Sequence, residues 1–547
     1  MRNISLTQLI GLNNRPWLTQ PQPLKPVFRI PFLFDYYSVD MKPVSANLFP
    51  GLPNTDLWGY VNYDGTVSVP PVIKARRNQP VLVRWNNKLA APNTAVNHPF
   101  INENQIPPMP MNMGPVCGNV HTQIGDAVVH FHGGEVMPGS DGRPTRPIKP
   151  GKAVFDWYPN RQRGATLWVH DHTMDYTATN VYAGLSGFYI LEDTQEEAAL
   201  HLPSGNYDWP IVLQDRILDS SGKFVYRIGG IDPATNIRVP EFIGDLPLVN
   251  GQLLPRMQVE PTWYRLRLLN GSNTRFYNLR FHITDLLDAS QYGMHPDIDV
   301  WQIATDGGLT SRPAQYESNG LLLAPGERVE LVVNFARVGN SKITLYSDIA
   351  IPYQGATNSS ADYFPLLGFE VGNSVLQAQH FSPDTNLRHI PDLPAPSTTP
   401  KIVTLLEKVE PIPGDVPGIS TPQASMAPHG SFEADGVTPK GMHYCEGITV
   451  CETVVLNTTE DWTFSNTTGD FHPMHMHLMQ FQVVSGGQNL MDCNGAPVKA
   501  MKDTVAVSPG GTVTVRAKFS PYKGEYVYHC HILEHEDMGM MRTFKVI

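Results

Sequence analysis

The chain has 547 residues, which is more than one hydrophobic core usually organises, so we expect about three domains. Acidic side chains outnumber basic ones by 51 to 40, the formal net charge is −11, and no basic run indicates a nucleic-acid partner. No apolar stretch is long enough to span a membrane, and the 45 glycines and 49 prolines favour short strands joined by loops.

The N-terminal ten residues show no sign of an export signal. They lack the apolar stretch and the small-residue cleavage site of a signal peptide. Two possibilities stay open: the protein works inside the cell, or it is secreted and a leader has been removed. The pattern gives no indication of the oligomeric state.

Two pairs of histidines, each with one residue between them, occur in the first third of the chain: His130 with His132, and His170 with His172. Successive side chains of a strand point to opposite faces. Each pair therefore presents both imidazoles on one face. A lone histidine is usually solvated or hydrogen-bonded, whereas repeated pairs of this kind indicate a metal site, because imidazole binds copper, zinc, iron and nickel.

A proline–glycine pair, followed by an alternating strand, a short turn and a second strand, occurs three times. Repeated short strands separated by turn residues indicate a Greek-key sandwich or barrel. Three copies predict three related all-β domains. The copies are residues 150–157 with 165–170, 325–333 with 342–346, and 509–515 with 525–529.

The boundaries follow from these copies and from one change in composition. A segment rich in proline and polar residues separates the second copy from the third, which is typical of an interdomain linker. The expected division is residues 1–200, 201–373, a linker at 374–400, and 401–547.

The third domain adds another histidine pair, His475 with His477. His472 precedes His475 by three residues, an odd offset. On an extended strand His472 faces the opposite way from the pair. It is therefore free to join a second site.

The segment near the C-terminus is the most informative. Cys530 lies between His529 and His531, with His535 five residues on and Met540 ten residues on. Two imidazoles, a thiolate and a weak axial thioether make a blue-copper site. If Cys530 faces that copper, strand alternation turns His529 and His531 toward a different site. One tripeptide then joins two metal sites covalently, which is the layout of an electron-transfer path.

The three copies differ in the residues just after the second strand. In the first copy Asp171 replaces the cysteine, and Tyr176 stands where a histidine would be needed for a blue copper. The second copy runs into residues 347–349, which include no ligand. We therefore interpret the second domain as a spacer, and expect the histidine cluster between the first and third domains, with four histidines from each.

These motifs together resemble the multicopper oxidases of the three-domain laccase and bilirubin oxidase type. The chain is most similar to the bacterial spore-coat laccases and to phenoxazinone synthase. The likeness extends over nearly the whole chain. It is carried by residues 130–134, 167–174, 181–185, 472–478, 502–504 and 528–541.

The resemblance implies three cupredoxin domains and four copper ions, one blue copper and one trinuclear cluster. The blue copper takes His472, Cys530 and His535, with Met540 rather than its neighbour Met541 as the axial ligand. At the cluster the single copper takes His130 and His475. The copper pair takes His132, His170, His172, His477, His529 and His531.

The implied reaction is one-electron oxidation of phenols, aminophenols or bilirubin-like aromatics, coupled to four-electron reduction of dioxygen to water. A metallo-oxidase acting on Cu(I), Fe(II) or Mn(II) is the alternative, and would need carboxylates or methionines on a path to His535. A non-enzymatic copper-binding or coat protein would not need the complete ligand set.

Dioxygen reduction consumes protons, and two carboxyls match family positions. Glu536 follows His535 directly, and Asp141 lies nine residues after His132. Each carboxyl also has an alternative role: Glu536 as a solvated surface acid, and Asp141 as a turn residue, since it stands between two glycines at 139 and 142.

Three features stay open. Residues 407–451 look loop-like where relatives carry a short strand pair, which leaves the substrate pocket undefined. Met109, Met111 and Met113 are soft ligands for Cu(I) or, as we favour, packing residues of a loop. The remaining cysteines allow three pairings, and a local bridge and free thiols are both possible. They are Cys117, Cys445, Cys451 and Cys493.

Overall fold

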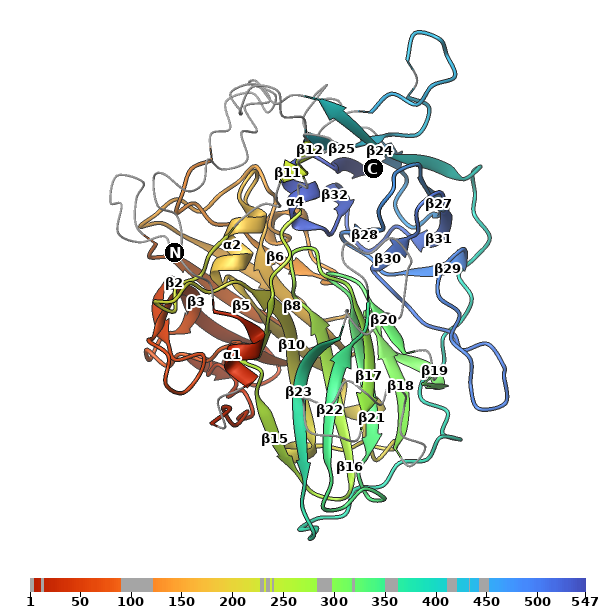
Figure 1. Cartoon of the computed structure of the whole chain (residues 1–547). Coiled ribbons are helices and arrows are strands. Elements are labelled where there is room, and N and C mark those ends of the chain that lie inside the picture. The colour runs from red at the N-terminus through yellow and green to blue at the C-terminus, as the bar shows by residue number, and fades with distance from the viewer. Residues whose placement is uncertain are drawn as a thin grey trace.

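A computed structural model describes most of the chain, and strands dominate it (Figure 1). The helices are short: α1 (Leu6–Ile10), α2 (Thr177–Ala183), α3 (Thr194–Glu197) and α4 (Leu533–Asp537). Within the described residues no helix has the length and apolar character needed to cross a membrane. The described residues are all except 1–3, 11–13, 90–121, 227–230, 233–236, 239–240, 283–297, 317–319, 350–362, 411–420, 432 and 442–451.

The first pair of sheets lies in residues 28–192. A five-stranded sheet has the order β1-β2-β5-β7, with β3 paired to β2, and a four-stranded sheet has the order β4-β9-β8-β6. The bounds are β1 (Phe28–Ile30), β2 (Phe34–Ala46), β3 (Thr55–Asn62), β4 (Val72–Arg76), β5 (Val81–Asn87), β6 (Val129–His132), β7 (Ala153–Tyr158), β8 (Ala165–Asp171) and β9 (Ser186–Glu192).

The second pair of sheets lies in residues 208–371. Its orders are β14-β13-β10-β16-β21-β18-β19 and β15-β23-β22-β17-β20, with β11 and β12 as a separate ribbon. The bounds are β10 (Asp208–Arg216), β11 (Ile231–Asp232), β12 (Ile237–Arg238), β13 (Leu246–Val249), β14 (Gln252–Leu253), β15 (Arg256–Val259), β16 (Trp263–Asn270), β17 (Tyr277–His282), β18 (Asp299–Thr305), β19 (Gly308–Gln315), β20 (Leu321–Leu323), β21 (Arg328–Asn334), β22 (Lys342–Ser347) and β23 (Phe364–Val371).

The third pair of sheets lies in residues 401–546. Its orders are β25-β24-β27-β31-β29 and β26-β33-β32-β28-β30. The bounds are β24 (Lys401–Glu410), β25 (Thr421–Ala427), β26 (Glu452–Val454), β27 (Thr459–Asn466), β28 (His472–Met476), β29 (Phe481–Ser485), β30 (Thr504–Val507), β31 (Thr512–Lys518), β32 (Gly524–Cys530) and β33 (Met541–Val546).

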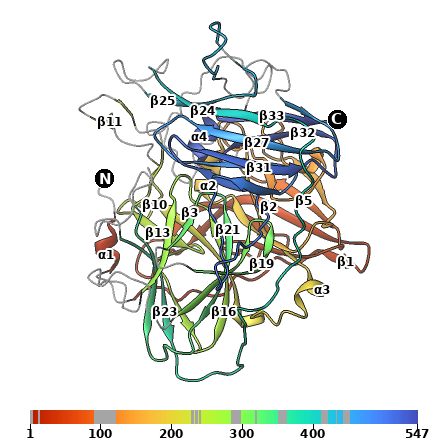
Figure 2. The same ribbon diagram turned by 90° about the vertical axis from the view of Figure 1, so that its right-hand side faces the viewer.

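The all-β prediction is confirmed, and each of the three sequence copies forms two successive strands, one in each sheet of its sheet pair: β7 and β8, β21 and β22, β31 and β32. Each pair of sheets has its own apolar core, with Trp85 in the first, Leu266 in the second and Trp462 in the third. Figure 2 shows the third pair of sheets above the second pair. Strands of the first pair lie at the height where the other two pairs meet.

Residues 372–400, which include the predicted linker, carry no helix or strand. The segment is nevertheless anchored. Arg388 is buried, and its guanidinium donates to Glu196 and to the carbonyl of Gly164, both near the first pair of sheets.

The prediction of a loop between Glu407 and Cys451 was wrong for residues 407–410 and 421–427, which are strand, whereas residues 428–431 and 433–441 carry no helix or strand. β25 pairs antiparallel with β24, with Thr404 opposite Ala427 and Val409 opposite Pro422. β25 lies at the edge of its sheet, a position that tolerates a proline because one side needs no ladder hydrogen bonds. The small and polar residues of β25 hid this strand, which depends on its partner.

Some predictions fall outside the described residues. They concern the methionines at 109, 111 and 113 and the cysteines at 117, 445 and 451. Of the described cysteines, Cys493 is exposed and Cys530 is buried, and both are free.

Candidate metal centres

The first candidate centre consists of three side chains that are distant in sequence. His472 opens β28, Cys530 ends β32 and His535 lies in α4. The sulfur of Cys530 is 3.5 Å from Nδ1 of His472 and 3.8 Å from Nδ1 of His535, and the two nitrogens are 3.2 Å apart. All three side chains are fully buried. Two imidazoles and one thiol converging on one point are the donor set of a blue copper.

Met540 lies against this centre through its backbone and its packing. Its N–H donates to the carbonyl of His535, and its carbonyl accepts from the N–H of Cys530. Its side chain is buried in the same apolar cluster as Cys530. Met541 packs instead with Val527 in a different cluster, which favours Met540 as the axial ligand.

If this centre binds a blue copper, we expect Met540→Leu to raise its reduction potential, because a weak thioether ligand lowers the potential relative to no ligand. A tenfold change in relative stability of the two copper oxidation states corresponds to about 59 mV for a one-electron couple, and we expect a rise of about this size. A redox titration followed by the blue absorption measures it. An unchanged or lower potential would rule out Met540, and Met541→Leu is the matched control.

The second candidate centre contains eight buried imidazoles from two pairs of strands. In the first sheet pair β6 and β8 set His130 opposite His170, and in the third β28 and β32 set His475 opposite His529. The two antiparallel strand pairs face each other with stacked rings. The His132 and His475 centroids are 3.6 Å apart, and those of His130 and His477 are 3.7 Å apart. The remaining rings of this centre are those of His172 and His531.

Most of these rings turn Nδ1 toward an oxygen. The carbonyl of Asp141 is 2.6 Å from Nδ1 of His130, and the carbonyl of Asp503 is 2.8 Å from Nδ1 of His475. Since such a partner holds the Nδ1 proton, Nε2 keeps its lone pair for a metal. Nε2 of His130 and of His475 is buried without a hydrogen-bond partner among the described residues. His170, His172, His477 and His529 use Nδ1 in the same way.

The surroundings favour the neutral form of His130, His475 and His477. Burial lowers the pKa of His130, His475 and His477 well below the ordinary value, and the neighbouring histidines lower it further. Neutral imidazole is the form that binds a metal ion. Nε2 of His529 lies 3.3 Å from Nε2 of both His172 and His477. A group of buried nitrogens this close together, several of them without another partner, fits a metal cluster.

Comparison with known proteins decides which metal chemistry this is. Family models described as multicopper oxidase match residues 119–196 and 417–547. A laccase from Bacillus stratosphericus is 32% identical, with 94% of this chain and 95% of that protein covered.

The chain belongs to the multicopper oxidase family. A bilirubin oxidase from Albifimbria verrucaria is 29% identical, covering 93% of this chain and 76% of that protein. The crystal structure of a variant of the McoA multicopper oxidase from Aquifex aeolicus superposes with a TM-score of 0.71 at 26% identity, covering 97% and 99% of the two chains. The protein is thus a copper oxidase, with dioxygen and a reducing substrate as its reactants.

Both carboxyls singled out in the sequence of this oxidase contact the histidine cluster. The two oxygens of Glu536 lie 2.9 Å from Nδ1 of His172 and 3.1 Å from Nδ1 of His529. Asp141 Oδ2 lies 2.8 Å from Nδ1 of His477, and burial, with a contribution from the nearby Asp156, raises the pKa of Asp141 well above its usual value. Glu536 is therefore no surface acid. Asp141 does follow a short turn (Pro138–Ser140), but its side chain faces the cluster.

Four residues at these centres were missed by sequence reasoning. Glu241 Oε1 lies 2.8 Å from Nε2 of His535, and Glu407 lies at the ring of His472. Asp503 contacts His132 of the cluster, and Arg328 contacts Asp503. The sequence carried a weak signal for Asp503 alone, in the 502–504 motif, and none for the others, because each contact joins distant segments.

Proposed function

We propose that the oxidase removes single electrons from a phenolic, aminophenolic or related aromatic substrate at the blue-copper centre and reduces dioxygen to water at the histidine cluster. The observation that carries this is the placement of Cys530 between His529 and His531, with the thiol at one centre and both imidazoles at the other. Bound copper supplies the one-electron redox chemistry at both centres. The relatives named laccase and bilirubin oxidase support the substrate class.

The ligand assignment rests on the two centres. We assign His472, Cys530 and His535, with Met540 as the axial ligand, to one copper ion. The eight histidines of the cluster are assigned to the other three copper ions. Within the cluster, the mutual approach of His172, His477 and His529 supports placing them on one ion of the pair. His130 and His475 then hold the single copper, and His132, His170 and His531 hold the other ion of the pair.

The domain limits 1–200, 201–373 and 401–547 are part of the same proposal. They are supported by the three pairs of sheets, none of which shares a strand with another. The two centres then lie within the third domain and between the third domain and the first.

Glu536 and Asp141 are the proposed proton-supplying residues. Glu536 Oε1 accepts a hydrogen bond from the hydroxyl of Thr177 at 2.6 Å, which fixes the carboxyl beside His172 and His529. A carboxyl held this close to the reacting centre is placed to pass protons to the oxygen atoms that become water.

Dioxygen uptake by the copper-loaded protein tests the proposal. We expect rapid uptake with an o-aminophenol or a dimethoxyphenol and little with Fe(II) or Mn(II). Uptake with the metal ions and none with the aromatics would instead establish the second candidate, a metallo-oxidase. No uptake with either would contradict both.

The second candidate is favoured by one observation, the carboxylates at the blue-copper histidines. Glu241 faces Nε2 of His535 at 2.8 Å, and Glu407 Oε1 lies 3.8 Å from Nε2 of His472. Carboxylate oxygens suit hard divalent cations, and the imidazole beyond Glu241 offers a direct path for an electron.

We expect Glu241→Gln to separate the two candidates. If a metal ion binds beside His535, its rate of oxidation should fall about 10- to 100-fold, the usual effect of losing a carboxylate near a metal, and aromatic oxidation should change much less. Steady-state rates with Fe(II) and with a dimethoxyphenol measure this. Equal losses on both substrates would show that Glu241 only orients His535.

A further inference from the structure

Arg328 is a fully buried residue of the second pair of sheets, and it uses all five of its N–H groups. Nε donates to the carbonyl of Thr166 at 3.0 Å, in the first pair of sheets. The terminal nitrogens donate to the carbonyls of Gly326 and Asp306, at 3.0 and 3.2 Å. They also grip both carboxylate oxygens of Asp503, at 2.8 and 2.5 Å, next to β30 of the third pair. One guanidinium thus ties the three sheet pairs together.

Asp503 in turn contacts the histidine cluster. Its Oδ1 is 3.1 Å from Nε2 of His132, and its backbone carbonyl is 2.8 Å from Nδ1 of His475. The hydroxyl of Thr504 also donates to Oδ1, at 2.9 Å. Asp503 therefore contacts one candidate ligand from each of the two facing strand pairs.

The contact of Asp503 reverses the orientation of His132 relative to its neighbours. Because the carboxylate accepts from Nε2, the proton of His132 lies on Nε2 and the lone pair lies on Nδ1. Nδ1 of His132 is 3.4 Å from Nε2 of His170, inside the cluster. The position of the Asp503 carboxylate thus decides which nitrogen of His132 faces the metal.

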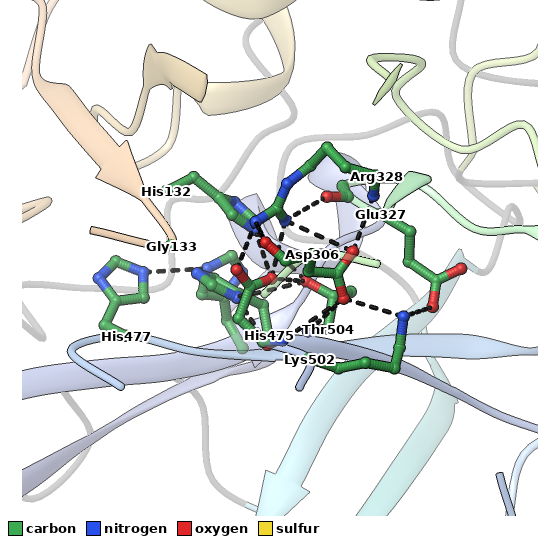
Figure 3. Close-up of polar contacts among 12 residues, drawn as sticks. His132, Gly133, Asp306, Glu327, Arg328, His475, His477, Lys502 and Thr504 are labelled. Carbon is green, nitrogen blue, oxygen red and sulfur yellow. Dashed lines mark hydrogen bonds and ion pairs between the residues drawn. The ribbon is translucent and has the colours of Figure 1, made fainter. Parts of the chain in front are cut away.

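A set of buried charged side chains surrounds Arg328 and Asp503 and fixes their positions. Asp306 accepts from the backbone N–H of Arg328 at 2.7 Å, and Lys502 lies between Asp306 and Glu327, at 2.9 and 3.1 Å. Figure 3 shows the contacts that join Glu327, Lys502, Asp306 and Arg328 beside the histidine cluster. Asp306, Glu327 and Arg328 all come from the second pair of sheets or its turns.

The backbone leaves no space between this set and the cluster. Gly133 has φ +81°, and a Cβ there would lie 2.6 Å from Oδ2 of Asp503 and 2.8 Å from a terminal nitrogen of Arg328. A Cβ at Gly326 would lie 2.7 Å from the ring of His531. The second of the three proline–glycine turns is therefore packed directly against the cluster.

We propose that Arg328 is a positioning residue of the histidine cluster: it fixes the Asp503 carboxylate, and through it the ring orientation of His132. This rests on the ligand assignment given above. A planar guanidinium matches a carboxylate at two points, whereas a lysine ammonium binds as a single point charge. The second domain, which the sequence suggested is only a spacer, then determines part of the copper geometry.

Copper retention in Arg328→Lys tests the proposal. The variant keeps the charge but loses the two-point grip. We expect it to keep the blue absorption of the Cys530 centre and to lose cluster copper to a chelator about 10- to 100-fold more readily. We also expect an altered electron paramagnetic resonance signal from the single copper, because the backbone carbonyl of Asp503 holds its proposed ligand His475. Copper per chain and the two spectra are measured on the copper-loaded protein, without substrate.

Arg267→Lys is the matched control. Arg267 is also buried in the second pair of sheets and grips Asp208 at two points, at 2.7 and 2.9 Å, and its other contacts are Glu330 and Thr166. If both variants hold cluster copper like the parent, or lose it equally, the proposal is overturned. Should Arg328→Lys fail to fold, Asp503→Asn takes its place, with the same expectation and the same contrary result. A parent protein that does not load the cluster would contradict the proposed function instead.

Discussion

Replacing Cys530 with serine should remove the blue absorption and lower the rate of aromatic oxidation by more than about 100-fold. Loss of a residue that only hydrogen-bonds to a metal ligand typically costs about 10- to 100-fold, and loss of the ligand itself should cost more. The serine hydroxyl remains protonated and is a hard donor, whereas copper at this centre needs a soft thiolate. Burial raises the pKa of the Cys530 thiol, although the neighbouring His535 opposes this. The metal must therefore displace a proton when it binds.

The visible spectrum, copper per chain and dioxygen uptake measure the effect of Cys530→Ser. The histidine cluster should keep its copper, because its eight imidazoles are unchanged. Cys493→Ser is the matched control, because Cys493 is exposed and its sulfur lies 4.0 Å from Asp384, a surface contact. A Cys530→Ser protein that remains blue, or that oxidises the aromatic at the parent rate, would refute the assignment of this centre.

Replacing Glu536 with glutamine should slow dioxygen reduction by about 10²- to 10⁴-fold, the range that positioned acid–base groups contribute. The amide has nearly the same shape and keeps an oxygen for the hydroxyl of Thr177. It has no exchangeable carboxyl proton to pass on beside His172 and His529. The blue absorption should not change, because Glu536 contacts none of the three blue-copper side chains.

The decisive comparison for Glu536→Gln is Glu534→Gln in the same helix. Glu534 is equally buried, but it accepts hydrogen bonds from Asn273, Thr274 and Tyr226 rather than facing the cluster. Stopped-flow reoxidation of the fully reduced protein by dioxygen measures the step directly. If the two variants are slowed equally, Glu536 has a structural role and the proton assignment fails.

Strand alternation is the physical reason why so much of the site was predictable. In an extended segment, which face a side chain takes depends only on whether its offset is odd or even. The offset of three between His472 and His475 therefore separated them, and the structure has His472 beside Cys530 and His475 beside His529. The three proline–glycine copies predicted two successive strands each for the same reason, because turn chemistry and alternation are both local.

What the sequence by itself determined is thus the all-β class, the three repeats, and the sorting of ten histidines and one cysteine between two centres. Only the tertiary structure decided which residues contact those side chains on the side away from each centre. Arg328 and Asp503 are 175 residues apart, and Glu241 and His535 are 294 apart. The alternation of residues along a strand does not predict such contacts, because they depend on how separate sheets pack against each other. The same holds for β25, which is a strand because β24 is beside it.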